Sequence, residues 1–185
     1  ILESMGLVVI HGSVLDWDNT GQGVAFVGPT GSGKSALAAW CNVSDLYLCM
    51  SDELLVASQV NDTWYAYAGP DAMWLRPDIA DAVGCRECEP VKVTWSERLL
   101  FKCGRDWQDQ PIKMRTIYVL DRRSDCDDVV IIPQIDYKAL RRLYKARYMP
   151  AADTLLGGRR SRLRALQGLS KQCLIKVLSY PTHID

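Results

Sequence analysis

Short apolar runs alternate with turn-forming clusters along most of the chain. The run at residues 23–27 is bounded by glycine at each end, which is typical of a strand buried on both faces in the middle of a sheet. Other runs rich in β-branched and aliphatic residues also predict strands. These runs are residues 7–10, 13–15, 47–50, 54–57, 64–67, 116–120, 128–132 and 173–178.

Four stretches have helical features. Residues 35–40 contain strong helix formers and begin where a glycine-rich segment ends. Residues 77–83 begin with proline and are followed by glycine, which are the usual start and stop signals. A potential cap at Asp136 precedes apolar residues at helical spacing, namely Leu140, Leu143, Tyr144 and Tyr148. With a fourth helix near residues 161–170, the pattern predicts a mixed α/β fold with some strands paired as hairpins.

The composition fits one domain. A chain of 185 residues with 48% hydrophobic residues is long enough to bury a core of its own, so we expect residues 1–185 to form a single domain. The chain opens at Ile1 and not at a methionine, which leaves open an N-terminal segment outside it.

Charge is balanced overall and uneven along the chain. Lys plus Arg and Asp plus Glu both number 22, so the net charge does not point to nucleic acid or to a membrane surface. Residues 138–164 are nevertheless strongly basic, with Asp153 as their single acid. We therefore expect an electropositive region there.

Other features favour a cytoplasmic protein. No apolar run approaches the length needed to cross a bilayer, and the first residues lack the pattern of a secretory signal. Seven cysteines is an odd number for a disulfide framework. Cys85 and Cys88, with Cys103 and Cys126, invite a zinc interpretation, but a second close pair is missing, so free thiols are the default expectation.

The segment from Gly28 to Ser35 has the pattern G-x-x-x-x-G-K-[ST] of a Walker A phosphate loop. Backbone N–H groups in such a loop, together with the helix that follows, form an anion site. Lys34 is placed to reach the β- and γ-phosphates and Ser35 to coordinate Mg²⁺. The predicted nucleotide-binding residues are Gly28, Pro29, Thr30, Gly31, Ser32, Gly33, Lys34, Ser35 and Ala36.

Phosphoryl transfer also needs carboxylates for the metal and for the attacking group. Asp52 and Glu53 are the candidates, since they interrupt a hydrophobic track soon after the loop. The alternative, without a role in catalysis, is that these two acids lie in a solvated turn between two strands.

These motifs resemble the HPr kinase/phosphorylase family and its wider group of HPr-kinase-like proteins. The resemblance rests on Ile10-His11-Gly12, the phosphate loop, Ser51-Asp52-Glu53 and the stretch from Trp74 to Pro77. It covers roughly residues 7–83, with weaker similarity in the C-terminal third. It implies a P-loop fold of the HPr-kinase (PEP-carboxykinase-like) type, a mixed sheet with strand hairpins around the loop.

The resemblance also implies roles for residues. Asp52 stands where the family has the aspartate that takes the proton from the acceptor serine, and His11 matches the histidine beside it. Glu53 stands where a second aspartate is usual, and it would join Ser35 and Asp52 as a metal ligand. The Glu-Ile-Arg-Gly signature of the bacterial enzymes is absent; Leu75-Arg76-Pro77 stands at a comparable place.

Several cations are candidates for neutralising the transferring phosphoryl group: Arg76, Arg159 and Arg160. An ordinary solvated basic face is the alternative for each. The aromatic residues, including Trp64, Tyr65, Tyr67 and Trp74, are more typical of core or edge strands than of a base-stacking platform, although one of them could stack on adenine.

The sequence therefore predicts a cytoplasmic, ATP- and Mg²⁺-dependent serine kinase. The preferred acceptor is a serine of a peptide or protein, such as HPr or a ribosomal-peptide precursor of the lasso-peptide type, because some divergent relatives act on such precursors. Two alternatives stay open: an ATP-binding regulatory module without transfer, and a kinase of a small hydroxyl compound such as free serine. We expect no nucleic-acid or membrane partner, and the resemblance leaves room for a homo-oligomer.

Overall fold

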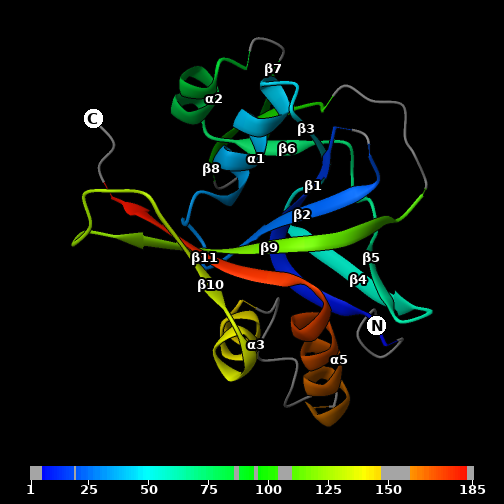
Figure 1. Cartoon of the computed structure of the whole chain (residues 1–185). Helices are drawn as coiled ribbons and strands as arrows, with labels where there is room; N and C mark the ends of the chain where they lie inside the picture. The colour runs from blue at the N-terminus through cyan, green and yellow to red at the C-terminus, as the bar shows by residue number, and fades with distance from the viewer. Residues whose placement is uncertain are drawn as a thin grey trace.

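One large mixed sheet organises the fold, and helices cover both of its faces (Figure 1). The computed structural model describes residues 6–18, 20–85, 88–93, 96–103, 110–146 and 159–182. Its strands are β1 (Val8–Trp17), β2 (Gln22–Val27), β3 (Tyr47–Ser51), β4 (Leu54–Val60), β5 (Thr63–Ala66), β6 (Met73–Leu75), β7 (Cys88–Val93), β8 (Ser96–Phe101), β9 (Ile112–Arg123), β10 (Val130–Gln134) and β11 (Leu174–Pro181). Its helices are α1 (Lys34–Val43), α2 (Pro77–Val83), α3 (Asp136–Lys145) and α5 (Arg159–Gln172). The predicted mixed α/β class is confirmed.

The strand order of the large sheet is β10-β11-β9-β2-β1-β4-β5, with β3 paired to the far end of β1. Strands β2, β9 and β11 run parallel, and the other pairs along this order are antiparallel. Strand β2 lies between β1 and β9, so the predicted central position of residues 23–27 is confirmed. The parallel strands end at one edge, where the phosphate loop follows β2.

Two apolar cores lie on opposite faces of this sheet. On one face, α3 and α5 pack through buried residues that include Leu143 and Leu169. On the other face, α1 and α2 pack against Leu15 and Phe26, helped by the alanines of α1. Figure 1 shows the two helix pairs above and below the sheet.

A second, three-stranded sheet with the order β6-β8-β7 was not predicted. Strand β6 has only three residues, and the sequences CEPVKV and SERLLF of β7 and β8 lack a long apolar run. All pairs are antiparallel: β7 and β8 are consecutive along the chain, whereas the pairing of β6 with β8 joins segments that are distant in the sequence.

The first strand and one helix start can be compared with the predicted boundaries. The runs at residues 7–10 and 13–15 belong to one strand before the loop, as predicted, because His11 and Gly12 continue the pairing of β1 with its neighbours. Gly12 permits this approach: a Cβ atom there would lie 2.7 Å from the carbonyl oxygen of Phe26. Asp136 is the first residue of α3 and not its cap, since the N-cap position is Ile135.

Among the residues that the structure describes, no helix has the length and apolar character required to span a membrane.

Leu169→Ala tests the packing of α5. Leu169 is fully buried, so its truncation should lower the free energy of unfolding by about 2–5 kcal/mol. Leu174→Ala is the matched control, because Leu174 is 63% exposed and should lose less than about 1 kcal/mol. Urea denaturation followed by circular dichroism measures both; equal losses would contradict the assignment of α5 to the core.

Candidate functional site

The phosphate loop lies between β2 and α1, in the strand–loop–helix order that the motif requires. Gly31 and Gly33 have φ angles of 80° and 79°, in the left-handed region that favours glycine. Gly33 is also the N-cap of α1, and no side chain caps this helix start. The loop and the first turn of α1 thus have the backbone conformation that the predicted anion site requires.

Lys34 is folded back over the loop. Its side chain is buried, and its Nζ donates hydrogen bonds to the carbonyl oxygens of Gly28 at 3.2 Å and Pro29 at 2.9 Å. Burial lowers the pKa of Lys34, while the negative charges of Glu53 and Asp52 act in the opposite direction. The ammonium group is therefore held at the loop by backbone carbonyls and two nearby carboxylates.

Asp52 is the buried acid of the site. Its Oδ1 accepts hydrogen bonds from the hydroxyls of Ser13 at 2.6 Å and Ser35 at 3.0 Å. Its Oδ2 is also buried, and it has no hydrogen-bond partner among the described residues. One carboxylate oxygen is thus held by two serines, and the other is available to a ligand or a proton.

The protonation of Asp52 reflects this environment. Burial raises the pKa of Asp52, the hydrogen bonds from Ser13 and Ser35 lower it, and the charge of Glu53 raises it further. The net direction is upward, because the cost of a buried charge is the largest of these effects. A carboxylate of this kind is a stronger proton acceptor than an exposed one.

Glu53 and His11 form a second polar group beside Asp52. The His11 Nε2 lies 3.3 Å from the Glu53 Oε2. His11 was predicted to lie beside Asp52, and the carboxylate that it contacts belongs to Glu53, the next residue in the chain. Glu53 has a φ angle of 75°, which places the sharp turn between β3 and β4 at this residue. The Gly12 N–H donates to the Glu53 carbonyl oxygen at 3.0 Å and fixes this turn to β1.

These groups line a cavity of about 320 Å³. The loop, Lys34 and Ser35 form one side, while His11 and Glu53 form another. Trp74, Leu75 and Ile79 add an apolar wall. A cavity lined by the loop, one carboxylate and an apolar wall has the mixed lining of a small-ligand site.

Two arginines reach this cavity. Arg76 was predicted, and its side chain is 71% exposed. It makes a bidentate ion pair with Asp78, in which Nε donates to Oδ1 at 2.9 Å and NH2 donates to Oδ2 at 2.7 Å. Arg122 was missed, although it lies just past the apolar run at residues 116–120 and at the end of the strand parallel to β2. Charged residues at that edge of a parallel sheet are a signal that could have identified it.

The other predicted cations lie elsewhere. Arg160 is exposed on α5, whose packing is against β1, β5 and β11, and it lines neither cavity beside the loop. The side chain of Arg159 lies outside the described residues. The predicted pairing of these arginines with the transferred phosphoryl group therefore stays a prediction.

The cysteine cluster is not assembled in the described part of the chain. Cys103 is buried in the core and Cys126 follows β9, both as thiols, while the side chain of Cys88 lies outside the described residues. Within the described ranges, no group of three His, Cys, Asp or Glu side chains is arranged around a common metal position.

Asp121 and Tyr180 were also missed, and both lie beside the loop. Asp121 lies near the end of β9, the parallel neighbour of β2, where many P-loop proteins carry their metal-binding acid. Here its carboxylate faces Arg142 at 3.7 Å, and Asp52 is the acid that contacts Ser35. Tyr180 donates its hydroxyl hydrogen to the Ser32 carbonyl oxygen and supports the loop from β11.

Comparisons with known proteins give limited information. No family model matches the sequence, and no curated protein matches it. A solved structure of the HPr(Ser) kinase/phosphatase from Coxiella burnetii is similar over 95% of this chain and 86% of that chain, with 10% sequence identity and a TM-score of 0.44. A likeness at this level does not establish function, which therefore rests on the geometry of the site.

Ser13→Ala tests how the buried carboxylate is held. Because the Ser13 hydrogen bond lowers the pKa of Asp52, its loss should raise that pKa and keep the carboxyl protonated to higher pH. Carbon-13 NMR of the Asp52 carboxyl group follows the titration directly. Ser58→Ala is the control, since the Ser58 hydroxyl bonds to Tyr67 on the exposed surface; an Asp52 titration that does not move in Ser13→Ala would refute the assigned hydrogen bond.

Proposed function

We propose that this protein is an ATP- and Mg²⁺-dependent serine kinase of the HPr-kinase-like type, acting on a serine of a peptide or protein. The observation that carries the proposal is the position of Asp52, a buried carboxylate hydrogen-bonded to the last residue of the phosphate loop motif and with one oxygen unpartnered among the described residues. Phosphoryl transfer to a hydroxyl needs a base at this position.

The triphosphate would bind to the loop amides between Gly28 and Ala36. Lys34 now donates to two loop carbonyls, and a bound phosphate offers the same ammonium group stronger, charged acceptors. We expect Lys34 to exchange these carbonyls for β- and γ-phosphate oxygens when the nucleotide binds.

The oxygen atoms at the site fit a magnesium ion. Ser35 Oγ and the Asp52 carboxylate are in contact, and Glu53 lines the same cavity. Hydroxyl and carboxylate oxygens are the protein ligands that Mg²⁺ prefers. Ser35, Asp52 and Glu53 would hold the ion, which supplies charge neutralisation at the phosphates when bound.

Asp52 would act as the general base. Its Oδ2 accepts the proton of the acceptor hydroxyl as the serine oxygen forms a bond to the γ-phosphorus, while the bond from that phosphorus to the β,γ-bridging oxygen breaks and ADP leaves. Burial raises the pKa of Asp52, which favours proton acceptance, and the serine bonds to Oδ1 keep Oδ2 in place. The contact of His11 with Glu53 supports a role for His11 in orienting the neighbouring carboxylate.

Arg122 and Arg76 would bind the negative charge that moves in the reaction. Both line the cavity with Lys34. Arg122 lies at the end of β9 next to the loop and donates to the Thr182 carbonyl oxygen, whereas Arg76 is paired with the charged carboxylate of Asp78, so Arg122 is the stronger candidate for the transferring phosphoryl group.

One assay separates this proposal from the two alternatives. Labelled ATP and Mg²⁺ are incubated with serine peptides, with free serine and with buffer alone. Label on a peptide supports the protein or peptide kinase, label on free serine supports a small-molecule kinase, and slow hydrolysis alone supports a regulatory nucleotide-binding module.

Asp52→Asn should abolish transfer while nucleotide binding is kept. The amide retains an oxygen that can accept from Ser13 and Ser35, but it cannot accept the proton, so we expect kcat to fall by roughly 10²–10⁴-fold. Asp81→Asn, at an exposed position of α2, is the control. Transfer by Asp52→Asn at the parent rate would remove Asp52 from the role of base.

Arg122→Gln should reduce kcat by roughly 10²-fold or more, because it removes a cation from the transferring phosphoryl group. Arg115→Gln is a matched control on the same strand, since Arg115 is exposed and bonds to Gln22 outside the site. The two variants are compared by steady-state kinetics with ATP and the best peptide. Similar kcat values for the two would exclude Arg122 from catalysis.

A further inference from the structure

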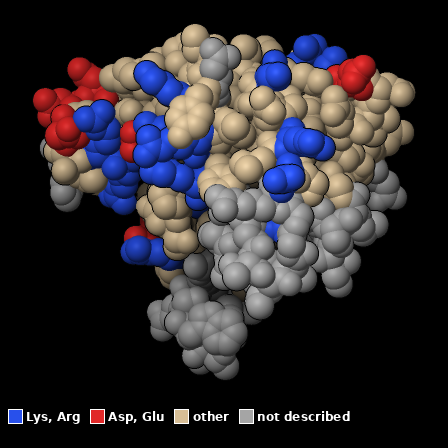
Figure 2. Space-filling model, turned by 90° about the horizontal axis from the view of Figure 1, so that it is seen from below, with Lys and Arg blue, Asp and Glu red and all other residues tan. Residues whose placement is uncertain are grey.

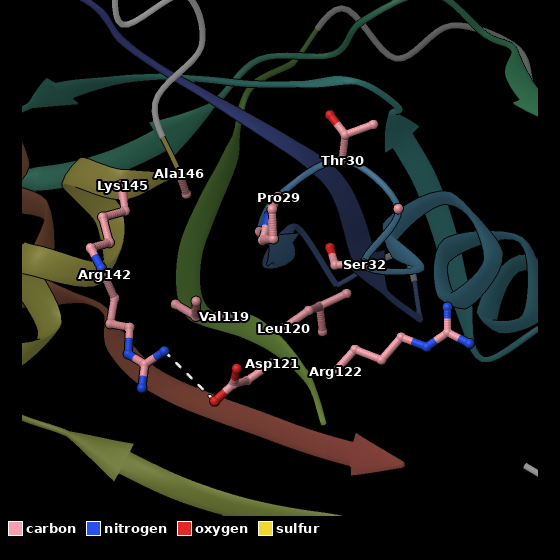
Figure 3. A pocket seen from close by; sticks show the side chains of 12 residues that line it. Pro29, Thr30, Ser32, Val119, Leu120, Asp121, Arg122, Arg142, Lys145 and Ala146 are labelled. Carbon is pink, nitrogen blue, oxygen red and sulfur yellow. Dashed lines mark ion pairs between the residues drawn. The ribbon is translucent and has the colours of Figure 1, made fainter. Parts of the chain in front are cut away.

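A second cavity, of about 380 Å³, adjoins the first one across the phosphate loop (Figure 3). The loop from Gly28 to Ser32 forms one wall, the end of β9 forms the floor, and the last turn of α3 forms the opposite wall. Thr30, Gly31 and Arg122 line both cavities. A ligand in the second cavity is therefore separated from the phosphate site only by the loop.

The charged side chains of this cavity are mostly cations. Arg142 and Lys145 come from α3, Arg122 from β9, and Asp121 is the single acid, so the lining has a net charge of +2 from three cations and one anion. Figure 3 shows Arg142 and Lys145 on the helix side and Asp121 on the strand below them. Figure 2 looks at the face that carries α3 and α5, where Lys and Arg side chains are spread and acidic ones gather at one edge.

The single acid does not saturate these cations. The Asp121 Oδ2 lies 3.7 Å from the Arg142 NH1, which is an ion pair longer than a good hydrogen bond. A guanidinium group has five N–H donors, so Arg142 can hold a second carboxylate in addition to Asp121. Lys145, one turn along the same helix, lines the same wall.

The rest of the lining suits an organic acid better than a bare ion. Val119, Leu120 and Pro29 give the cavity an apolar floor. The Ser32 Oγ, in the loop wall, is buried and has no hydrogen-bond partner among the described residues. A group with an apolar stem and an anionic end satisfies both parts of this lining.

Helix α3 is also connected to the catalytic side of the loop. The Ala146 carbonyl oxygen, just after α3, accepts a hydrogen bond from the His11 N–H at 3.0 Å. His11 in turn contacts Glu53 in the phosphate cavity. The end of α3, which carries Arg142 and Lys145, is thus hydrogen-bonded to β1, and His11 of β1 lines the first cavity.

We propose that the second cavity is a subsite for a carboxylate of the acceptor, held by Arg142 and Lys145, while the acceptor hydroxyl enters the first cavity and reaches Asp52 beside its lining residue Ser35. This inference rests on the proposed serine kinase activity, and it specifies the acceptor as a peptide with an acid close to the reacting serine. The carboxylate has two sources: an acidic side chain near the serine, or the free C-terminus of a peptide that ends in serine.

Binding of three fluorescent eight-residue peptides tests the subsite, with Mg²⁺ and a non-hydrolysable ATP analogue present. The first has an internal serine beside a glutamate and an amidated end, the second ends in serine with a free carboxylate, and the third is an amidated peptide with serine and no acid. At least one acidic peptide should bind roughly tenfold or more tightly than the acid-free one, because a charge-assisted contact is lost in the latter. The preferred peptide identifies the source of the carboxylate.

The variant Arg142→Gln/Lys145→Gln should reduce this preference to less than about twofold, while Lys138→Gln keeps it. Lys138 is the matched control because it is an exposed cation of the same helix and lines neither cavity. Equal affinity of the parent protein for all three peptides, or a double variant that keeps the full preference, would overturn the proposal.

Transfer from labelled ATP to the same peptides separates this inference from the proposed function. If an acidic peptide binds more tightly but no peptide is phosphorylated, the carboxylate subsite is supported and the kinase activity is refuted. Transfer to all three peptides with equal KM keeps the kinase activity and refutes the subsite. A KM that is lower by roughly tenfold for an acidic peptide, with similar kcat, supports both.

Discussion

The candidate site depends on one buried carboxylate oxygen, the Asp52 Oδ1. It accepts hydrogen bonds from Ser13 on β1 and from Ser35 at the start of α1, so it joins the central strand, the turn after β3 and the phosphate loop helix. A buried carboxylate is costly without such donors, and each donor is left unsatisfied without the carboxylate. Because the three groups satisfy one another, the position of the turn relative to the loop is fixed without a bound ligand.

The other polar side chains around this oxygen make contacts that are separate from it. Lys34 is pulled towards the loop carbonyls, and the pair of His11 and Glu53 lies beside the buried acid and not on it. The second oxygen of Asp52 therefore has no competing cation among the described contacts. Under the proposed kinase activity, this separation would keep the proposed base distinct from the groups proposed to hold phosphate.

Local features of this site could be predicted from the sequence, and non-local ones could not. The phosphate loop, its flanking strand and helix, and the proline-to-glycine limits of α2 are encoded in adjacent residues. Ser13 acquires its role because β1 pairs with β2 and with β3, and Arg122 because β9 is the parallel neighbour of β2. Strand order depends on contacts between distant segments, so the position of Arg122 beside the loop could not be predicted from the residues around it.

The bond from Tyr180 to the Ser32 carbonyl joins residues 148 positions apart in the chain. Strand β11, which carries Tyr180, lies between β9 and β10 and so enters the interior of the large sheet. During synthesis, the phosphate loop and α1 emerge from the ribosome long before this strand. The loop then lacks its tyrosine support, so the loop reaches its final geometry late, when β11 has docked and the sheet is complete; under the proposed function, full affinity for nucleotide would come only then.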